Sequence, residues 1–189
     1  MFKLVEDLFL TDTFLIKGRF EGKHGRLSQA LDGWRRGFVP VADATLVDLR
    51  THERFETPRV SIAWSELILA HELIDTGSDH YRRHLVAERP RVPIRAFLSG
   101  RLPLELSGEV APQAYDHGGL FQRCFILHQP RFRGLDCEKD LELRCLTQMS
   151  YAIVMRERLS YVYDFSDLLE RGAEAGDASS GDLGEGRVA

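Results

Sequence analysis

The chain has 189 residues, of which 43% are hydrophobic and 29% are charged, and its formal net charge is −4 at pH 7. These values are typical of a globular protein and lack the strongly basic balance of a dedicated nucleic-acid binder. No apolar run approaches the roughly 18 residues that a membrane-spanning helix needs, and the early acids Glu6 and Asp7 do not fit a secretory signal. We therefore expect a cytoplasmic protein without membrane insertion, built as one large or two small domains.

Two pairs of segments in the chain resemble each other. Residues 14–20 resemble residues 96–102, and the Gly-Arg pair that they share recurs after 82 residues. Residues 60–72 loosely resemble residues 143–157. Because a solenoid needs at least three shorter repeats, this pattern predicts two copies of one small unit.

The first unit contains four clear element signals after an ambiguous start. Residues 1–10 are apolar and indicate either a short helix or an edge strand. Residues 13–21 alternate as a strand does, and residues 26–33 have the leucine spacing and terminal glycine of a short helix. Residues 38–49 give the strongest strand signal, and residues 60–73 predict a strand, a polar turn and a second strand.

The second unit is expected to follow a polar connector at residues 75–91. Residues 94–106 predict two strands, residues 120–129 a buried strand and residues 158–165 a further strand. Residues 141–154 are interpreted as a copy of the hairpin that closes the first unit.

The first unit resembles a family of small uncharacterised bacterial domains, over roughly residues 13–74. The shared pattern is a strand ending in hydrophobic-x-Gly, an Arg-Leu-Ser helix, a Phe-x-Pro strand with an Asp-Ala pair, and a closing strand with a polar turn. The residues that carry the resemblance are Gly18, Arg26, Leu27, Ser28, Leu31, Phe38, Pro40, Asp43, Ala44, Val60 and Ile68. The pattern is in turn similar to an Sm-like small barrel, which implies a fold and little chemistry. The second unit lacks the Arg-Leu-Ser helix and the Asp-Ala pair.

We therefore predict a mainly β fold with two tandem small Sm-like β-barrel-type domains, one short helix in the first, and a disordered C-terminal tail. The first domain is expected at residues 10–74 and the second at residues 92–165. Residues 166–189 contain six acids and two bases and form the predicted disordered acidic tail. Sm-like RNA binders use an asparagine near their binding loops, and this chain has no asparagine.

Three groups of residues are candidates for binding a partner, because aromatic and arginine side chains dominate the energetics of protein interfaces. The first is the corner from Trp34 to Phe38, the second lies in the connector, and the third is on the last predicted strand. The predicted partner-binding residues are Trp34, Arg35, Arg36, Phe38, Tyr81, Arg82, Arg83, Arg89, Arg91, Tyr161 and Tyr163.

The connector also carries a basic cluster that could meet phosphates. It contains Arg82, Arg83, Arg89, Arg91 and Arg95. This cluster supports an alternative function as a nucleic-acid or nucleotide binder, which would depend strongly on salt. It could equally bind an acidic protein surface or the acidic tail of the chain itself.

A second alternative is a metal-dependent enzyme that uses His71, His80 or His84. His80 and His84 have the spacing of two ligands on one helix face, but the metalloprotease pattern that begins at His71 lacks its second histidine. The three cysteines lack zinc-site spacing, and we interpret them as buried reduced thiols. We predict no catalytic set, no metal site and no cofactor.

The function that we expect from the sequence is therefore non-enzymatic. We predict a cytoplasmic adaptor or scaffold that binds another protein and can also self-associate, because exposed edge strands of small barrels are ready assembly sites.

Overall fold

The structure is a computed structural model that describes residues 6–74, 90–116, 122–138 and 140–165. Its strands are β1 (Asp7–Thr11), β2 (Phe14–Phe20), β3 (Phe38–Asp48), β4 (Arg54–Ala63), β5 (Leu67–Glu72), β6 (Val92–Leu98), β7 (Glu105–Val110), β8 (Cys124–Arg133), β9 (Tyr151–Met155) and β10 (Leu159–Asp164). Its helices are α1 (Leu27–Gly33), α3 (Arg144–Thr147) and the 3-10 turns η1 (Trp64–Glu66) and η2 (Arg156–Arg158). The acidic tail and nearly all of the predicted connector lie outside the described residues.

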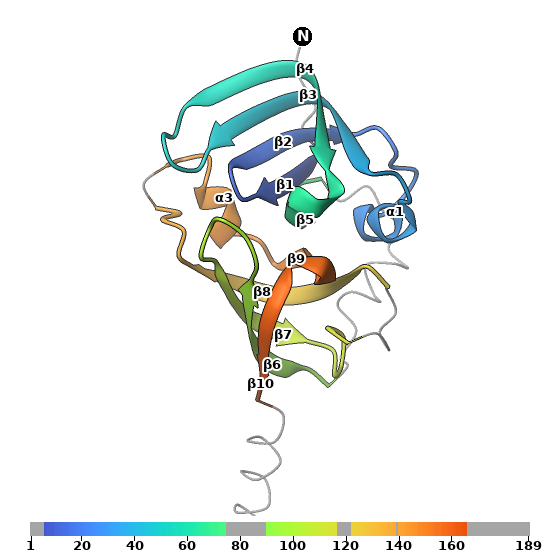
Figure 1. Ribbon diagram of the computed structural model, residues 1–189, viewed down its shortest axis with the longest axis vertical. Coiled ribbons are helices and arrows are strands. Elements are labelled where there is room, and N and C mark those ends of the chain that lie inside the picture. Colours follow the sequence, from blue (N-terminus) through green and yellow to red (C-terminus); the bar gives the residue numbers. More distant parts are fainter. Residues whose placement is uncertain (1–5, 75–89, 117–121, 139, 166–189) are drawn as a thin grey trace, which may run out of the picture.

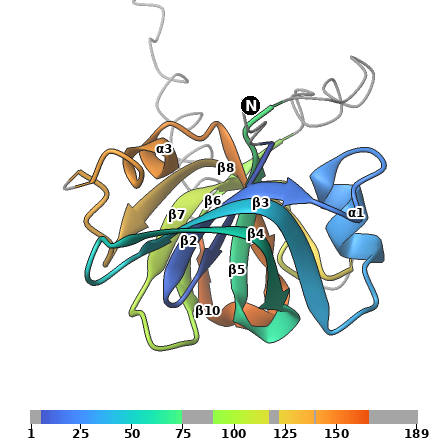
Figure 2. The ribbon, with the colours of Figure 1, turned by 90° about the horizontal axis from the view of Figure 1, so that it is seen from above.

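The ten strands form one open antiparallel sheet in the order β10-β6-β7-β8-β9-β5-β1-β2-β3-β4 (Figure 1). The prediction of a mainly β fold with a short helix in its first half is confirmed. The first half of the sheet consists of β1 to β5, and the second half consists of β6 to β10. Both halves have the same internal order: the fifth strand lies beside the first, and the second, third and fourth strands follow. The helices α1 and α3 lie on opposite sides of the strands (Figure 2).

Several predicted strands appear where the sequence places them. β2, β3 and β10 fall on the predicted segments, whereas β8 begins four residues later than predicted and continues to Arg133. The predicted closing hairpin of the first half is β4, η1 and β5, but β4 already begins at Arg54, six residues before the predicted start. The interruption at Gly18 has a packing reason: a Cβ there would lie 2.5 Å from Val41 Cγ1 and 2.8 Å from the carbonyl oxygen of Ala42. The glycine therefore allows β2 and β3 to approach closely.

The start of the chain departs from both alternatives that its sequence indicated. β1 is a strand, but it lies inside the sheet, where it pairs with β2 on one side and β5 on the other. Leu8, Phe9 and Leu10 are all fully buried. A continuous apolar run is the pattern of a strand buried on both faces, and neither a short helix nor an edge strand would bury all three side chains.

The alignment of the two expected copies is wrong. Residues 14–20 form β2, whereas residues 96–102 contain the end of β6 and the turn after it. Residues 141–150 form turns and α3 instead of a strand, and the hairpin that corresponds to the first closing hairpin is β9, η2 and β10. The Gly-Arg pairs therefore lie at different places in the two halves. Two short sequence similarities are not enough to determine how the halves align.

The two halves share their hydrophobic cores. One cluster packs Leu8 and Leu10 of β1 with Phe125 and Leu127 of β8, and a second cluster packs Phe9 with side chains of both halves, including Ile153 and Met155 of β9. In the ladder, the halves meet at β5 and β9, where Leu69 pairs with Val154 and Ala70 with Ile153. The halves are thus joined by backbone pairing and by packing on both faces of the sheet.

A buried network of charged side chains crosses this junction. Glu72, at the end of β5, accepts hydrogen bonds from Arg26 (3.1 Å), from the backbone N–H of Leu27 (2.9 Å) and from the Tyr151 hydroxyl (3.0 Å). Lys23 lies 3.2 Å from the same carboxylate. The carboxylate therefore connects β5 with the start of α1 and with β9.

Lys23 extends the network to β1. Its ammonium lies 2.7 Å from Asp7, which also accepts a hydrogen bond from the backbone N–H of Phe20 at 3.0 Å. Burial by itself would raise the pKa of Glu72, but the hydrogen bonds from Leu27 and Arg26 and the charge of Lys23 outweigh it and lower that pKa below its ordinary value. The ionised form of Glu72 is thus the one that the fold favours.

Replacing Glu72 by glutamine is expected to lower the free energy of unfolding by roughly 3 kcal/mol, because Arg26 and Lys23 would lose the charge that compensates their burial. Since the folded-state pKa is lowered, the stabilisation by Glu72 is present above its ordinary pKa of 4.5 and is lost as the pH falls through the folded-state value. Urea unfolding across this range should show the gap between wild type and variant shrinking in acid. Glu53→Gln, at an exposed turn, is the control and should change little.

Candidate functional site

The strand β10 lies at one edge of the sheet and carries the most exposed aromatic side chains of the described chain. It pairs with β6 on one side, and no other described strand covers its outer edge. Tyr161 is 71% exposed and Tyr163 is 59% exposed. Large aromatic side chains so open to water at a free strand edge are typical of interaction sites.

The register of the sheet places these tyrosines in two rows with side chains from three other strands. Residues directly opposite each other in an antiparallel sheet share a face. The first row is Tyr161, Phe97, Glu105 and Arg133, and the second is Tyr163, Arg95, Ser107 and Arg131. We call this surface of β10, β6, β7 and β8 the aromatic–arginine face.

Contacts within the aromatic–arginine face hold its side chains in place. The rings of Phe97 and Tyr163 meet edge to face with their centroids 5.7 Å apart, and the guanidinium carbon of Arg95 lies 6.0 Å from the centroid of Phe97. Arg95 also donates a hydrogen bond to Glu105 at 2.7 Å. Such packing reduces the side-chain entropy that binding a partner would cost.

The arginine side of this face is hollowed. A depression of about 380 Å3 is lined by Arg95, Glu105, Ser107, Arg131, Phe132 and Arg133. Glu105 is shared between Arg95 and Arg133, whose guanidinium lies 3.7 Å away. Three arginines against one glutamate leave the hollow cationic, beside the aromatic strand.

The predicted corner at Trp34 is largely a packing feature. The Trp34 ring contacts Phe20 edge to face at 5.0 Å, and its Nε1 donates a hydrogen bond to the carbonyl oxygen of Phe38 at 2.9 Å. Arg35 donates to the Asp32 carbonyl, and Arg36 stacks 5.4 Å above the Trp34 ring. Phe38 itself remains 58% exposed. This corner and the tyrosines of β10 belong to different halves of the sheet.

The basic cluster is described in part. Arg82, Arg83 and Arg89, together with Tyr81, lie outside the described residues. Arg91 lies 3.8 Å from Glu109 and Arg95 is bound to Glu105, so both arginines have acidic neighbours. In the described part, the cluster is therefore not a free cationic surface.

The histidines show no metal site in the described part of the chain. His71 is packed against Tyr151, with ring centroids 4.8 Å apart, and burial lowers its pKa. No group of three potential metal ligands occurs among the described residues. His80 and His84 lie outside the described residues.

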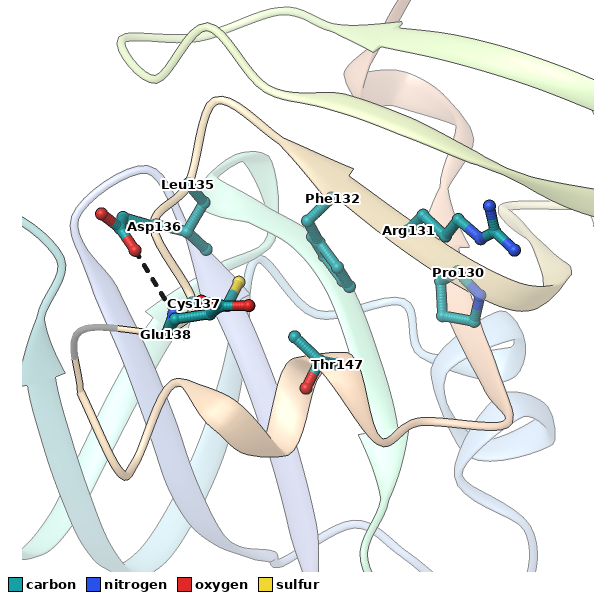
Figure 3. Close-up of a pocket in the computed structure, with 8 residues that line it drawn as sticks. All are labelled: Pro130, Arg131, Phe132, Leu135, Asp136, Cys137, Glu138 and Thr147. Atoms are coloured by element: carbon teal, nitrogen blue, oxygen red, sulfur yellow. Dashed lines mark hydrogen bonds between the residues drawn. The ribbon is translucent and has the colours of Figure 1, made fainter.

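A second hollow, of about 430 Å3, lies between the end of β8 and α3. Figure 3 shows the side chains of Phe132, Cys137 and Thr147 around it, and Asp136 turned toward the backbone of Glu138. Burial is the main cause that raises the pKa of Cys137 to about 11, so its thiol is protonated at neutral pH. A thiol that stays protonated is a poor nucleophile, because the thiolate is the reactive form.

The prediction of three buried thiols is confirmed for Cys124 and Cys137 and is wrong for Cys145, which is partly exposed.

Sequence reasoning found the two tyrosines of this face but missed most of their neighbours. Phe97, Arg131 and Arg133 were not among the predicted partner-binding residues. The signal was present, since Val92, Ile94, Ala96 and Leu98 put an apolar residue at every second position and leave Arg95 and Phe97 together on the other face. What the sequence lacked was the register that brings Tyr161 opposite Phe97.

Comparisons of the chain with protein-family models, with curated proteins and with solved structures gave no match. The resemblance to a family of small bacterial domains therefore stays a prediction. Among the described residues, no helix has the length and apolar character needed to cross a membrane.

Replacing Tyr161 or Tyr163 by alanine is expected to lower the free energy of unfolding by less than about 1 kcal/mol, because both side chains are mostly in water. Leu69→Ala, which truncates a fully buried side chain on β5, should cost about 2–5 kcal/mol. Urea unfolding of the three variants measures both effects. A large loss of stability in the tyrosine variants would mean that these residues serve the fold and not a binding partner.

Proposed function

We propose that this protein is a non-enzymatic cytoplasmic adaptor or scaffold, which binds another protein on its aromatic–arginine face. The observation that carries the proposal is the exposure of Tyr161 and Tyr163 on an edge strand, above Phe97 and Arg95. Tyrosine, tryptophan and arginine are the residues that contribute most to binding in protein interfaces. The outer edge of β10, which no described strand covers, adds backbone donors and acceptors that a partner strand could use.

The mixed composition of this face supports a protein partner over a nucleic acid. Glu105 lies among Arg95, Arg131 and Arg133, so the cationic hollow contains an acidic side chain that would repel a phosphate. Nucleic-acid binding depends on uncompensated arginines and lysines that replace counterions on phosphates. The aromatic platform is compatible with stacked bases, and for that reason nucleic-acid binding remains the alternative.

We further propose that the two halves are Sm-like barrel-type units in tandem. Support comes from their identical strand order and from the 3-10 turn that separates the fourth and fifth strands in each half. In this proposal β5 and β10 are corresponding strands, and so are β4 and β9.

A photo-crosslinking amino acid at position 161 tests the binding surface in cells. We expect covalent adducts with protein at this position, because a bound partner would lie within reach of the crosslinker. The matched control carries the same amino acid at position 50, an exposed turn residue between β3 and β4. Equal labelling at both positions would contradict the proposed surface.

The alternative function has its own test. Protein purified at low salt is analysed for absorbance at 260 and 280 nm during size-exclusion chromatography. Nucleic acid that coelutes and is removed at about 0.5 M salt would favour the nucleic-acid alternative, since phosphate contacts weaken as salt rises.

A further inference from the structure

The strand β8 continues beyond the end of its neighbour β9. β9 pairs with residues 124–128 of β8, whereas β7 pairs with β8 as far as Arg133. Among the described residues, the last backbone hydrogen bond on the β9 side runs from the Gln129 N–H to the Ser150 carbonyl oxygen (2.9 Å). Beyond it, no described strand lies beside residues 130–133 on that side. The end of β8 therefore has an open edge within the sheet.

A bulge explains why β8 leaves β9 at this point. In the β7–β8 ladder, Gly108 alone faces both Gln129 and Pro130. Gln129 has a φ of 50°, and a Cβ at Gly108 would lie 2.5 Å from the His128 carbonyl oxygen. An extra residue bends the strand and interrupts its pairing. Pro130 has no N–H to donate, so it ends the pairing on that side.

Two hollows border the open end of β8, one on each face. The hollow of about 380 Å3 on the aromatic–arginine face, the arginine hollow, contains the side chains of Arg131 and Arg133. The hollow of about 430 Å3 toward α3, the α3 hollow, contains those of Phe132, Cys137 and Thr147 (Figure 3). Both hollows are lined by Arg131 and Phe132, because successive side chains of a strand point to opposite faces.

The arginine hollow contains a guanidinium that is not yet engaged. Glu105 accepts a hydrogen bond from Arg95 at 2.7 Å and lies 3.7 Å from Arg133. Arg131, in contrast, is exposed and forms no ion pair or hydrogen bond with another described residue. A guanidinium matches a carboxylate in shape and charge. A single carboxylate needs one such guanidinium, unlike the row of phosphates of a nucleic acid, so the nearby Glu105 is tolerated.

The α3 hollow has apolar walls and an acidic rim. Pro130 and Cys137 are buried, and Phe132 is half-buried between them. Asp136 and Glu138 line the rim, where the Asp136 carboxylate accepts a hydrogen bond from the Glu138 N–H at 3.3 Å. These carboxylates repel a further acidic side chain, and the walls favour an apolar one. The two hollows therefore differ in the side chain that they accept.

We propose that the open edge of β8 at residues 130–133 binds an extended acidic segment of a partner protein, added as a further strand. The side chains of an added strand alternate between the two faces of the sheet. An acidic side chain then meets Arg131, and the next residue, which is apolar, enters the α3 hollow. This inference rests on the proposed binding role of the aromatic–arginine face and states the chemistry of the segment that its partner supplies.

Fluorescence anisotropy of labelled peptides with the full chain tests this chemistry. A fluorescein-labelled peptide with the alternation Asp-Leu-Asp-Leu-Asp should bind saturably. A peptide of the same composition in blocks, Asp-Asp-Asp-Leu-Leu, should bind at least about tenfold more weakly, because its acidic and apolar side chains no longer point to opposite faces. The alternation Lys-Leu-Lys-Leu-Lys should not bind, since Arg131 repels it.

Variants of the two hollows locate the site. Arg131→Glu should weaken binding of the acidic peptide at least about tenfold and give binding of the lysine peptide, because the charge of the site is reversed. Thr147→Trp fills the α3 hollow from an exposed position of α3 and should also weaken binding of the acidic peptide. The control Arg50→Glu reverses an exposed arginine between β3 and β4 and should leave binding unchanged.

A photo-crosslinker at position 147 identifies the occupant in cells. We expect adducts with another protein, whereas adducts with residues 166–189 of the same chain would assign the edge to the acidic tail and overturn the inference. Equal binding of the three peptides, or an Arg131→Glu variant that binds the acidic peptide like wild type, would also overturn it. Protein adducts from position 161 without any peptide binding would refute the β8 site alone and leave the proposed binding surface standing.

Discussion

The carboxylate of Glu72 is the point on which the arrangement of the two halves depends. It is buried at the end of β5, and it accepts hydrogen bonds from α1 and from β9 while Lys23 ties it to β1. A buried carboxylate is tolerated when its charge is compensated, and the partners of Glu72 come from α1, β9 and Lys23. The network therefore does more than offset its own burial, because the hydrogen bond from Tyr151 forms with β9 beside β5.

Attachment of the second half to β5 makes the molecule asymmetric. At the outward positions of β1 and β5, Leu8, Leu10 and Leu69 become part of a core shared with β8 and β9. The corresponding positions of β6 and β10 have no such cover among the described residues and carry tyrosine, phenylalanine and arginine. Side chains that tolerate both water and an apolar partner are suited to a surface that is exposed in one state and covered in another.

Local pattern was enough to predict β2, β3 and the hairpin of β4 and β5, because alternation and turn residues act within a few positions. It was not enough for β1, whose apolar run fits several structures until its two neighbours are known. No sequence signal indicated that Asp7, Lys23 and Glu72 are buried, since isolated charged residues usually lie on the protein surface. The tyrosines of β10 were predictable as an exposed pair, but their pairing with Phe97 and Arg95 required the long-range register.

The edge strands show how a sheet can be open to one contact and closed to others. The first part of β4 is protected by charges and Pro58, and its second part, residues 60–63, carries no charge and no proline. β10 carries no lysine, arginine or proline between Leu159 and Asp164, although these residues are the usual protection of an edge. Protection of this kind is therefore absent at two places, and they lie on the strands whose counterparts, β9 and β5, pair inside the chain.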